Sequence, residues 1–503
     1  SINSYENAIS LNSNYSDAFN NLGVVFKKLG QFNNSVNSYE AALEINYDDA
    51  DTHNNLGIVL VELGFLDDAI NTYNNAIKIK PDMAEAHNNL GHVLSQLNLY
   101  AEAIIAYDNA FQIKPDLEYI LGNILNAKMN ACSWENLPNL LNDIKESQRN
   151  TNNKIVDPFS LMGLIDDPSL QRKVTEIRVL SDHPKSNILP LNNKYSKHKK
   201  IRIGYFSGDF KKHPVGYLTA GLYEEHNRDQ FEIHAFSLGP DTKDELNLRI
   251  KSGVDHFHDV QAMPYKDIVV LARSLEIDIA VDLAGLTAKS KTDIFAMSVA
   301  PIQMSYIGYL GTMGADYYDY LIADPIMIPK ESQKHYVEKI IYLPSFQVND
   351  SKDLPPNITL TRKDVGLPKE GFVFCCFNNT YKFTPATFDS WARILQQVED
   401  SVLIVFTNNE LSKTNLTKEI LKRGIEAERL IFGDSLSRPD YMARYRVADL
   451  FLDTQPYNAG TTASDALRMG LPMLTLKGKS YQARMGASII NALNLPELIT
   501  NTP

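Results

Sequence analysis

Three short stretches of this 503-residue chain carry residue types that suit the binding of an anion or the transfer of a proton. A Gly-Thr-Thr stretch at 460–462 opens a helix-like segment, whose unpaired backbone N–H groups and dipole favour an anion. Lys382 follows an apolar run and places an ammonium group at its end. Asp209 and His213 lie in one loop and bring together a carboxylate and an imidazole, which are groups that proteins use for proton transfer. The three stretches together indicate chemistry on a ligand that contains phosphate.

Each stretch also has an ordinary explanation, and these explanations stay open at this point. A lysine is usually a surface residue, a single histidine is usually incidental, and Gly-Thr-Thr is often a simple helix start. Thr462 and Asp465 predict a capping pair in that helix. The Asp-x-Asp motif at 49–51 lies far from these stretches, and the chain has no Gly-x-Gly-x-x-Gly or Walker loop. A metal-bound diphosphate is therefore not expected, and Lys382 with the helix N-terminus would have to meet the phosphate charge.

The elements that must position these residues are strands of parallel sheets. Short apolar runs alternate with amphipathic ones, which is the pattern of strands and crossover helices. Ligands of such sheets bind beyond the carboxyl ends of the strands, where these stretches lie. The pattern restarts after a Pro-containing stretch, so we expect two doubly wound domains with a cleft between them. The expected strands are 201–206, 232–237 and 277–283 in the first domain, and 372–378, 401–407, 430–432, 450–453 and 472–476 in the second.

A repeat occupies the first quarter of the chain. Asn-Leu-Gly occurs three times, and Gly23, Gly57 and Gly91 follow one another at a step of 34 residues. This period predicts tetratricopeptide repeats, in which paired helices stack into a solenoid. The same step separates further residues that we expect to pack inside the repeats, namely Tyr5, Tyr39, Tyr73 and Tyr107, and Ala8, Ala42, Ala76 and Ala110.

Paired asparagines recur on the face of the repeats that we expect to be concave. Their side-chain amides could hold the backbone of an extended peptide, although a solvated helix surface is an equally good interpretation. The residues expected to bind peptide are Asn54, Asn55, Asn88 and Asn89. The resulting domain prediction is a repeat array at 1–131, a helical cap and linker at 132–198, a first lobe at 199–350 and a nucleotide-binding lobe at 351–503.

Composition narrows the class of protein. Apolar residues make up 44% and charged residues 22% of the chain, and the net charge of −12 argues against a nucleic-acid-binding protein. No apolar run has the length of a membrane span. The three cysteines lack metal-ligand spacing and are expected to be reduced. We expect a soluble, cytoplasmic protein, and both ends of the sequence look cut.

Several motifs follow the repeats in a fixed order: Asp209-Phe210, His213-Pro214, Ala300-Pro301-Ile302-Gln303, Gly308-Tyr309, Gly311-Thr312, Tyr381-Lys382 and Gly460-Thr461-Thr462. With the repeat array, this set resembles the O-linked N-acetylglucosamine transferases of glycosyltransferase family 41, over essentially the whole chain. The resemblance implies an α-solenoid followed by a GT-B pair of Rossmann-like lobes. It implies inverting transfer of N-acetylglucosamine from UDP to Ser or Thr of proteins, with no cofactor and no required metal. The large insert of animal members is absent, which indicates a bacterial-type enzyme.

The resemblance also implies roles for single residues of the second lobe. Lys382 matches the essential lysine at the diphosphate, and Asn379 falls where a Gln contacts it. Thr461 and Thr462 match phosphate-binding threonines, and Asp465 matches a carboxylate near the ribose.

The uracil side of the implied site shows two departures from the animal pattern. Leu436 and Arg444 match uracil contacts, and Arg438 falls where a lysine touches the nucleotide. Tyr441 stands where animal members have a histidine beside the base, and Gly460 replaces a histidine before the threonine pair. These departures bear on the donor sugar and the rate.

In the first lobe, His213 matches a histidine proposed as general base or as a sugar-side group. Asp209 occupies the position of another proposed proton acceptor, and Ile307 and Gly308 match backbone positions beside the sugar. The alternatives are a related transferase that uses UDP-glucose or GDP-fucose, and a repeat scaffold with weak catalysis. Family members continue into C-terminal helices beyond Pro503, so we expect low activity of this chain. The expected partners are a UDP-sugar and protein acceptors, with no nucleic acid and no membrane.

Overall fold

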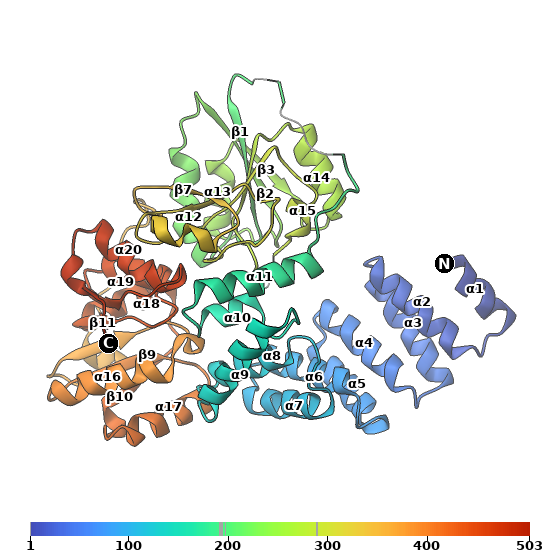
Figure 1. The fold of residues 1–503 in the computed structure, drawn as a ribbon, viewed down its shortest axis with the longest axis horizontal. Helices are drawn as coiled ribbons and strands as arrows, with labels where there is room; N and C mark the ends of the chain where they lie inside the picture. Colours follow the sequence, from blue (N-terminus) through green and yellow to red (C-terminus); the bar gives the residue numbers. More distant parts are fainter. Residues whose placement is uncertain (1, 191–194, 197, 288–289) are drawn as a thin grey trace. The chain divides into compact units, whose positions relative to one another are not determined.

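The computed structural model describes residues 2–190, 195–196, 198–287 and 290–503. The chain divides into two compact units, Ser1–Ile144 and Lys145–Pro503. In Figure 1 the blue helices belong to the first unit, and both sheets belong to the second.

The first unit is a helical repeat array, as the 34-residue period predicts. Consecutive helices pack in pairs, α2 with α3, α4 with α5 and α6 with α7, and the first helices of successive repeats also contact one another. The helices are α1 (Ile2–Leu11), α2 (Ser16–Lys28), α3 (Phe32–Ile45), α4 (Ala50–Leu63), α5 (Leu66–Ile79), α6 (Ala84–Gln96), α7 (Tyr100–Ile113), α8 (Ile120–Asn130) and α9 (Leu137–Asn150).

Glycine allows the two helices of each repeat to approach closely. A Cβ atom on Gly57 would lie 2.6 Å from the ring of Tyr73, and Gly23 and Gly91 meet Tyr39 and Tyr107 in the same way. All three tyrosine rings are buried. The repeated Gly and Tyr residues are therefore packing residues, as expected from the period.

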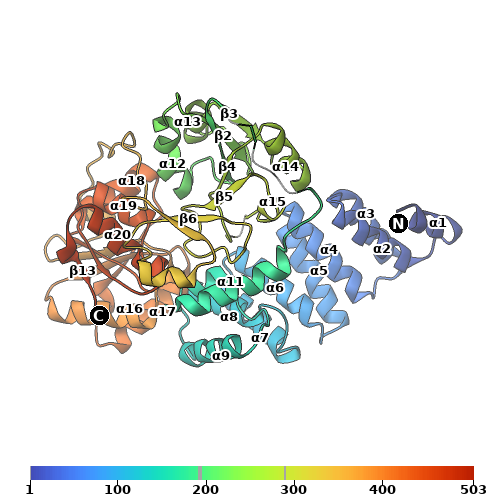
Figure 2. The ribbon, with the colours of Figure 1, turned by 45° about the horizontal axis from the view of Figure 1, so that its top comes forward.

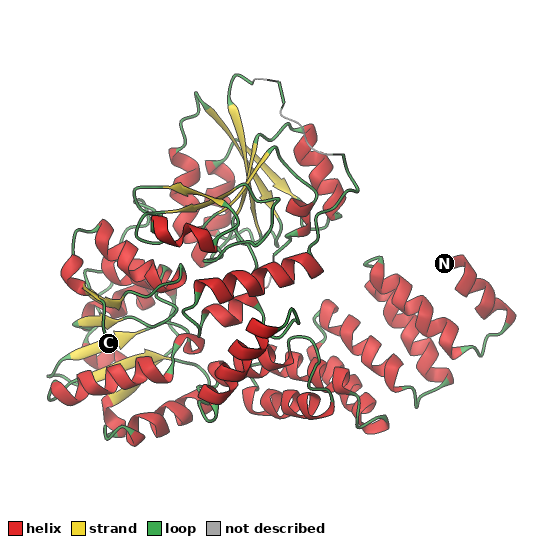
Figure 3. Ribbon diagram, viewed as in Figure 1, coloured by secondary structure: helices red, strands yellow, loops and turns green. Residues whose placement is uncertain are grey.

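The second unit begins with a helical linker and continues into a first sheet. The seven strands are all parallel, in the order β3-β2-β1-β4-β5-β6-β7. Helices α12 and α13 lie on one side of this sheet and α14 on the other, as labelled in Figure 1. Figure 3 shows the same view with helices in red and strands in yellow. The elements are α10 (Pro158–Met162), α11 (Pro168–Asp182), β1 (Ile201–Ser207), α12 (Pro214–Glu225), β2 (Phe231–Ser237), α13 (Glu245–Gly253), β3 (His256–Asp259), α14 (Tyr265–Ser274), β4 (Ile279–Asp282), α15 (Asp293–Ala296), β5 (Ile302–Ser305), β6 (Tyr320–Ala323) and β7 (Lys339–Tyr342).

A second parallel sheet follows, with the strand order β10-β9-β8-β11-β12-β13. Figure 2 shows its helices α16 to α20 around these strands, in orange and red. The elements are β8 (Val373–Cys376), a 3₁₀ turn (Thr380–Lys382), α16 (Pro385–Gln397), β9 (Val402–Phe406), α17 (Glu410–Lys422), β10 (Leu430–Gly433), α18 (Arg438–Arg444), β11 (Leu450–Leu452), α19 (Thr461–Arg468), β12 (Met473–Leu476), α20 (Met485–Ala492) and β13 (Ile499–Thr500).

The predicted strands of both sheets are confirmed, with ends that differ by a few residues. Strands β3, β5, β6, β7 and β13 were not predicted. The two sheets form two Rossmann-like lobes after a helical repeat array, which is the predicted fold class. No helix in the described part of the chain has the length and apolar character that a membrane crossing requires.

Candidate functional site

Both sheets reverse their direction of growth at a central pair of strands. In the first sheet the chain extends on one side of β1 and then on the other side from β4, and in the second sheet the same reversal separates β8 from β11. Ligands of doubly wound sheets bind at the carboxyl ends of such strand pairs. Lys382 follows β8 and α19 follows β11, so the predicted phosphate-binding residues lie at the switch point of the second sheet.

The ammonium group of Lys382 lies in a half-buried position after the end of β8, with the Asp453 carboxylate nearby. Its Nζ donates to the backbone oxygen of Asn458 over 3.1 Å and lies 3.9 Å from the centroid of the Tyr457 ring. Burial lowers the pKa of Lys382 to about 8, although the nearby Asp453 carboxylate opposes this shift. The lysine is therefore a cation that is poorly solvated and close to the loop leading into α19.

Two residues that the sequence analysis did not select hold this loop in place. Asp453 accepts from the backbone N–H groups of Thr454 and Ala459 at 2.8 and 2.7 Å, and burial raises its pKa to about 6. Asn378, at the end of β8, donates to the hydroxyl of Thr454 over 2.7 Å and accepts from Thr462 over 2.5 Å. Asn378 thus ties the exit of β8 to the first turn of α19.

The N-terminus of α19 has no side-chain cap, and the predicted capping pair is wrong. Gly460 occupies the N-cap position, Thr461 and Thr462 are the first helical residues, and among the residues that the structure describes no side chain caps the first turn. Asp465 cannot form the pair because it lies a full turn into the helix and contacts Arg438 instead, at 3.3 Å. The first turn therefore keeps N–H groups that can serve an anion.

Arg438 joins the two lobes next to this helix. Its guanidinium lies 3.2 Å from Asp353 and 3.3 Å from Asp465, and it stacks 3.8 Å from the ring centroid of Tyr217 in the first lobe. Burial lowers the pKa of Arg438, but the two carboxylates outweigh it and raise the pKa above its ordinary value. Burial raises the pKa of Asp465, and Arg438 opposes that shift.

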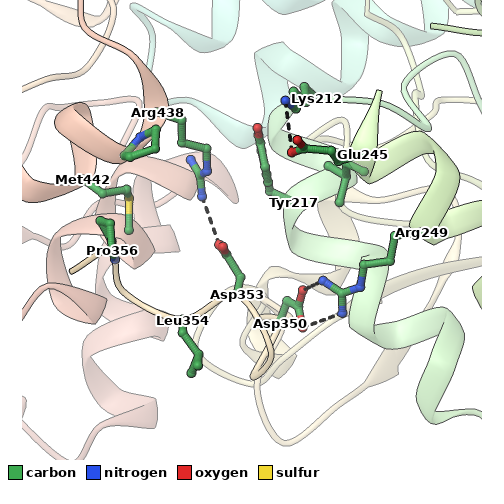
Figure 4. A pocket seen from close by; sticks show the side chains of 12 residues that line it. Lys212, Tyr217, Glu245, Arg249, Asp350, Asp353, Leu354, Pro356, Arg438 and Met442 are labelled. Carbon is green, nitrogen blue, oxygen red and sulfur yellow. Dashed lines mark hydrogen bonds and ion pairs between the residues drawn. The ribbon is translucent and has the colours of Figure 1, made fainter. Parts of the chain in front are cut away.

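A cavity of about 300 Å³ opens beside Arg438, between α12, α13 and α18. Figure 4 shows Arg438 directed towards Asp353, with Tyr217 facing them from α12. A second ion pair, Arg249 with Asp350, lies at its far wall. The walls of this cavity thus come from both lobes.

An aromatic and cationic cluster lies on the other side of α18. The guanidinium of Arg444 is buried, lies 3.8 Å from the ring centroid of Phe377 and donates to the backbone oxygen of Asp434 over 3.0 Å. Tyr441 shares a hydrogen bond of 2.6 Å with the hydroxyl of Tyr445. Tyr445 in turn donates to the backbone oxygen of Thr462 over 3.4 Å, so this cluster reaches the tip of α19. Leu436 lies in the loop between β10 and α18.

His213 and Asp209 lie together after β1. His213 caps α12, because its Nδ1 accepts from the backbone N–H of Val215 over 3.3 Å, and the same Nδ1 lies 3.5 Å from Asp209 Oδ2. An accepting Nδ1 leaves the neutral ring with its proton on Nε2. In this arrangement Nε2 is a hydrogen-bond donor.

The backbone around Ile307 and Gly308 is tightly constrained. Ile307 has a φ of 60°, which a β-branched residue rarely adopts. A Cβ atom on Gly308 would lie 1.9 Å from the backbone oxygen of Leu283, so only glycine fits. This turn follows β5 and packs on the exit of β4, which is the switch-point strand of the first sheet.

Asn379 and the linker complete the surroundings of Lys382. Asn379 is exposed, and its side chain hydrogen-bonds Tyr381. The ring of Phe159, in α10, lies 6.1 Å from the rings of both Tyr381 and Tyr457. Sequence reasoning missed Phe159, since nothing in the linker sequence indicates contact with the turn at Tyr381 and the loop at Tyr457, more than two hundred residues further along the chain.

The asparagines of the repeat array pair with one another from repeat to repeat. Asn89 donates to Asn54 over 3.0 Å, Asn55 to Asn20 over 3.3 Å, and Asn123 to Asn88 over 3.0 Å. Asn54 is also buried. Some of the amides on this predicted peptide surface therefore already form hydrogen bonds between neighbouring repeats.

Known proteins match the chain in both units. Residues 25–64 and 59–98 match the family described as TPR repeat, and residues 84–117 match Tetratricopeptide repeat. A solved structure of a Lys-to-Met mutant of Thermobaculum terrenum O-GlcNAc transferase is similar, with a TM-score of 0.69 and 26% identity, over 97% of this chain and 87% of that chain.

Two curated relatives match about three fifths of the chain. A probable UDP-N-acetylglucosamine–peptide N-acetylglucosaminyltransferase, SEC, of Arabidopsis thaliana is 36% identical over 303 residues, 59% of this chain and 31% of the relative. A Caenorhabditis elegans UDP-N-acetylglucosamine–peptide N-acetylglucosaminyltransferase is 24% identical over 417 residues, 60% of this chain and 36% of the relative. The chain thus spans about a third of the length of these relatives. Residues 174–360 and 349–503 match Glycosyl transferase family 41, and the chain belongs to that family.

Proposed function

We propose that this chain is a protein O-glycosyltransferase that moves N-acetylglucosamine from UDP to Ser or Thr hydroxyls with inversion. Family membership and the activities after which the relatives are named support the reaction class. The observation that carries the proposal is the pairing of a poorly solvated ammonium, Lys382, with the uncapped N-terminus of α19 at one switch point. This pairing suits a departing diphosphate.

In inverting transfer, the negative charge that develops on the leaving diphosphate must be stabilised by the enzyme. The acceptor oxygen forms a bond to the anomeric carbon from the face opposite the diphosphate, while the bond from that carbon to the phosphate oxygen breaks. In the proposed arrangement Lys382 and the N–H groups of Thr461 and Thr462 offset the charge that grows on the diphosphate. Their low solvation strengthens this effect.

The nucleotide would lie against α18 and α19. Arg444 and Tyr441 offer a planar cation and a ring for a base, and Asp465 offers a carboxylate for ribose hydroxyls, with Arg438 beside it. These are proposals from the resemblance. The contact of Arg444 with the ring of Tyr441 and the ion pair of Arg438 with Asp465 support them. We propose that the transfer needs no metal.

The acceptor proton must leave as the new bond forms. Asp209 is the better-placed acceptor in this arrangement, because the Nδ1 of His213 already accepts from the backbone and its Nε2 carries the ring proton. We propose that His213 donates to a sugar or acceptor oxygen, and that Asp209 or the diphosphate itself takes the proton.

Incubating the chain with protein acceptors and single nucleotide sugars tests the proposed function. We expect mass spectrometry to find an N-acetylhexosamine on Ser or Thr with UDP-N-acetylglucosamine. A hexose with UDP-glucose alone, or a deoxyhexose with GDP-fucose alone, would replace the proposed donor. If no donor gives a product and UDP does not raise the melting temperature, the transferase proposal is rejected and the chain is a repeat scaffold without catalysis.

The activity should fall as pH rises through about 8. The lowered pKa of Lys382 means that its ammonium loses its proton at a lower pH than an ordinary lysine, and a neutral amine offsets no charge. The pH dependence of kcat/KM reports the pKa of Lys382 in the free enzyme, so kcat/KM should fall above about pH 8. The pH dependence of kcat reports the enzyme with bound donor, whose diphosphate raises the pKa of the lysine, so kcat should fall only at higher pH. In Lys382→Arg this fall should disappear, because a guanidinium keeps its charge. An unchanged fall in this variant would assign it to another group.

Acceptor binding by the repeat array has its own test. Replacing Asn55 and Asn88 with alanine removes two amides, each worth about 0.5 to 1.5 kcal/mol in a hydrogen bond, so KM for protein acceptors should rise about tenfold. Hydrolysis of the donor in the absence of acceptor should not change. The matched control replaces Asn71 and Asn74, which are exposed on α5. Equal effects of the two double variants would reject the peptide surface.

We also propose a cytoplasmic location and a bacterial-type arrangement of the lobes. The three cysteines are buried and unpaired, which suits a reducing compartment. The first sheet ends at Tyr342 and the second begins at Val373, so a short segment joins them.

A further inference from the structure

Three histidines and a glutamate meet at the amino ends of β2 and β3. Glu232 and His234 alternate on one face of β2, and His256 and His258 do so on the edge strand β3. The register pairs His234 with His256 and Phe236 with His258, so these side chains project from the same face of the sheet. The proposed transferase site uses the opposite, carboxyl ends of the strands.

The distances between these side chains match those between ligands of one small ion. Glu232 Oε1 lies 3.3 Å from His234 Nε2 and 3.0 Å from His256 Nε2. The three ligand atoms all lie within 4.8 Å of one another. Ligand bonds of about 2.1 Å in a tetrahedral site put neighbouring ligand atoms about 3.4 Å apart. One ion could therefore contact all three with small adjustments of the side chains.

The second nitrogen of His234 also has a partner. His234 Nδ1 lies 3.1 Å from His258 Nε2, so an N–H at Nδ1 can donate to His258 and leave the Nε2 lone pair directed towards Glu232 and His256. Metal-binding histidines commonly donate their other N–H in this way.

The surroundings leave the site accessible and balance its charge. The side chain of His234 is 3% exposed, whereas those of Glu232 and His256 are 28% and 51% exposed, so solvent can supply a fourth ligand. Arg202 lies 3.4 Å from the other oxygen of Glu232, Oε2, and leaves Oε1 for an ion. The charge of Arg202 is shared with Glu276, 3.0 Å away.

We propose that Glu232, His234 and His256 bind one Zn²⁺ ion, which clips the edge strand β3 to β2. Two imidazoles and a carboxylate suit zinc and similar transition metals, and not Mg²⁺ or Ca²⁺, which prefer oxygen ligands alone. This site is separate from the proposed transfer reaction and does not depend on it.

The test uses the whole chain, free of any histidine tag and stripped with a chelator. Calorimetric titration should find one Zn²⁺ per chain, and Co²⁺ in place of Zn²⁺ should give the visible absorption of a four-coordinate ion. In His256→Ala the Zn²⁺ affinity should fall at least tenfold, and a Zn²⁺ concentration that just saturates the parent chain should raise the melting temperature of the variant less than that of the parent. Glu232→Gln should weaken binding in the same direction.

The matched control is His335→Ala, which removes a histidine outside this group and should bind Zn²⁺ like the parent chain. His256→Ala and His335→Ala should keep the parent melting temperature in chelator and should keep UDP binding, which shows that both are folded. Equal Zn²⁺ affinity of the parent and His256→Ala, or no binding by the parent, would overturn the proposal and leave a hydrogen-bonded histidine cluster only.

Discussion

Replacing Lys382 with alanine is expected to lower turnover by about 10²- to 10³-fold or more, the usual effect of removing one group that stabilises transition-state charge. The lysine is held by Asn458 and the ring of Tyr457 beside the uncapped start of α19. Its low solvation makes its charge more effective on a nearby diphosphate than it would be in water. Single-turnover kinetics with UDP-N-acetylglucosamine measures the effect on the chemical step.

Two further variants separate charge from packing. Lys382→Met keeps an apolar stem over Tyr457 and should be as slow as Lys382→Ala. Lys413→Ala removes a surface lysine that pairs with the exposed Glu410 in the same lobe, and it should turn over normally. The melting temperature of Lys382→Ala should change little, because the lost hydrogen bond is offset by relief of the buried charge. Normal turnover in Lys382→Met would reject the electrostatic role.

Much of the fold could be predicted from the sequence because central strands are continuous apolar runs. β1, β8 and β9 are buried over most of their length, so their sequences contain few polar residues. β3 was not predicted because three of its four residues, His256, His258 and Asp259, are polar, as an edge strand allows. β13 has two residues and no pattern of its own.

The candidate site was predictable only where a residue type carries its own chemistry. Lys382 and the threonines of α19 stand out by type and by their place after apolar runs. Asn378 does not, because its role depends on Thr454 and Thr462, which lie 76 and 84 residues further along the chain. The capping prediction failed for a similar reason, since Asp465 takes an ion pair with Arg438 that only the folded lobe supplies.

The turn at Gly308 should be the position in the first lobe that is most sensitive to a single methyl group. In Gly308→Ala the new Cβ would lie 1.9 Å from the backbone oxygen of Leu283 and 2.7 Å from its carbonyl carbon, and a backbone cannot rotate away as a side chain can. Such overpacking costs about 1 to 3 kcal/mol of the free energy of unfolding. The preceding Ile307 already has a φ of 60°, so the turn has little freedom to absorb the change.

To relieve this clash the turn at Gly308 must move, and the movement should slow transfer by about 100-fold, since a shift of about 1 Å in a positioning group has effects of that size. UDP binding should persist, because the residues proposed to bind the nucleotide belong to the other lobe. The control is Gly208→Ala, at the exit of β1, where the nearest atom to an added Cβ is 3.9 Å away. Measuring melting temperature, UDP affinity and transfer rate for both variants distinguishes a local effect on the sugar side from general unfolding. If Gly308→Ala lost UDP binding in parallel with transfer, the turn would act through the stability of the whole unit, and its proposed place beside the sugar would have no support.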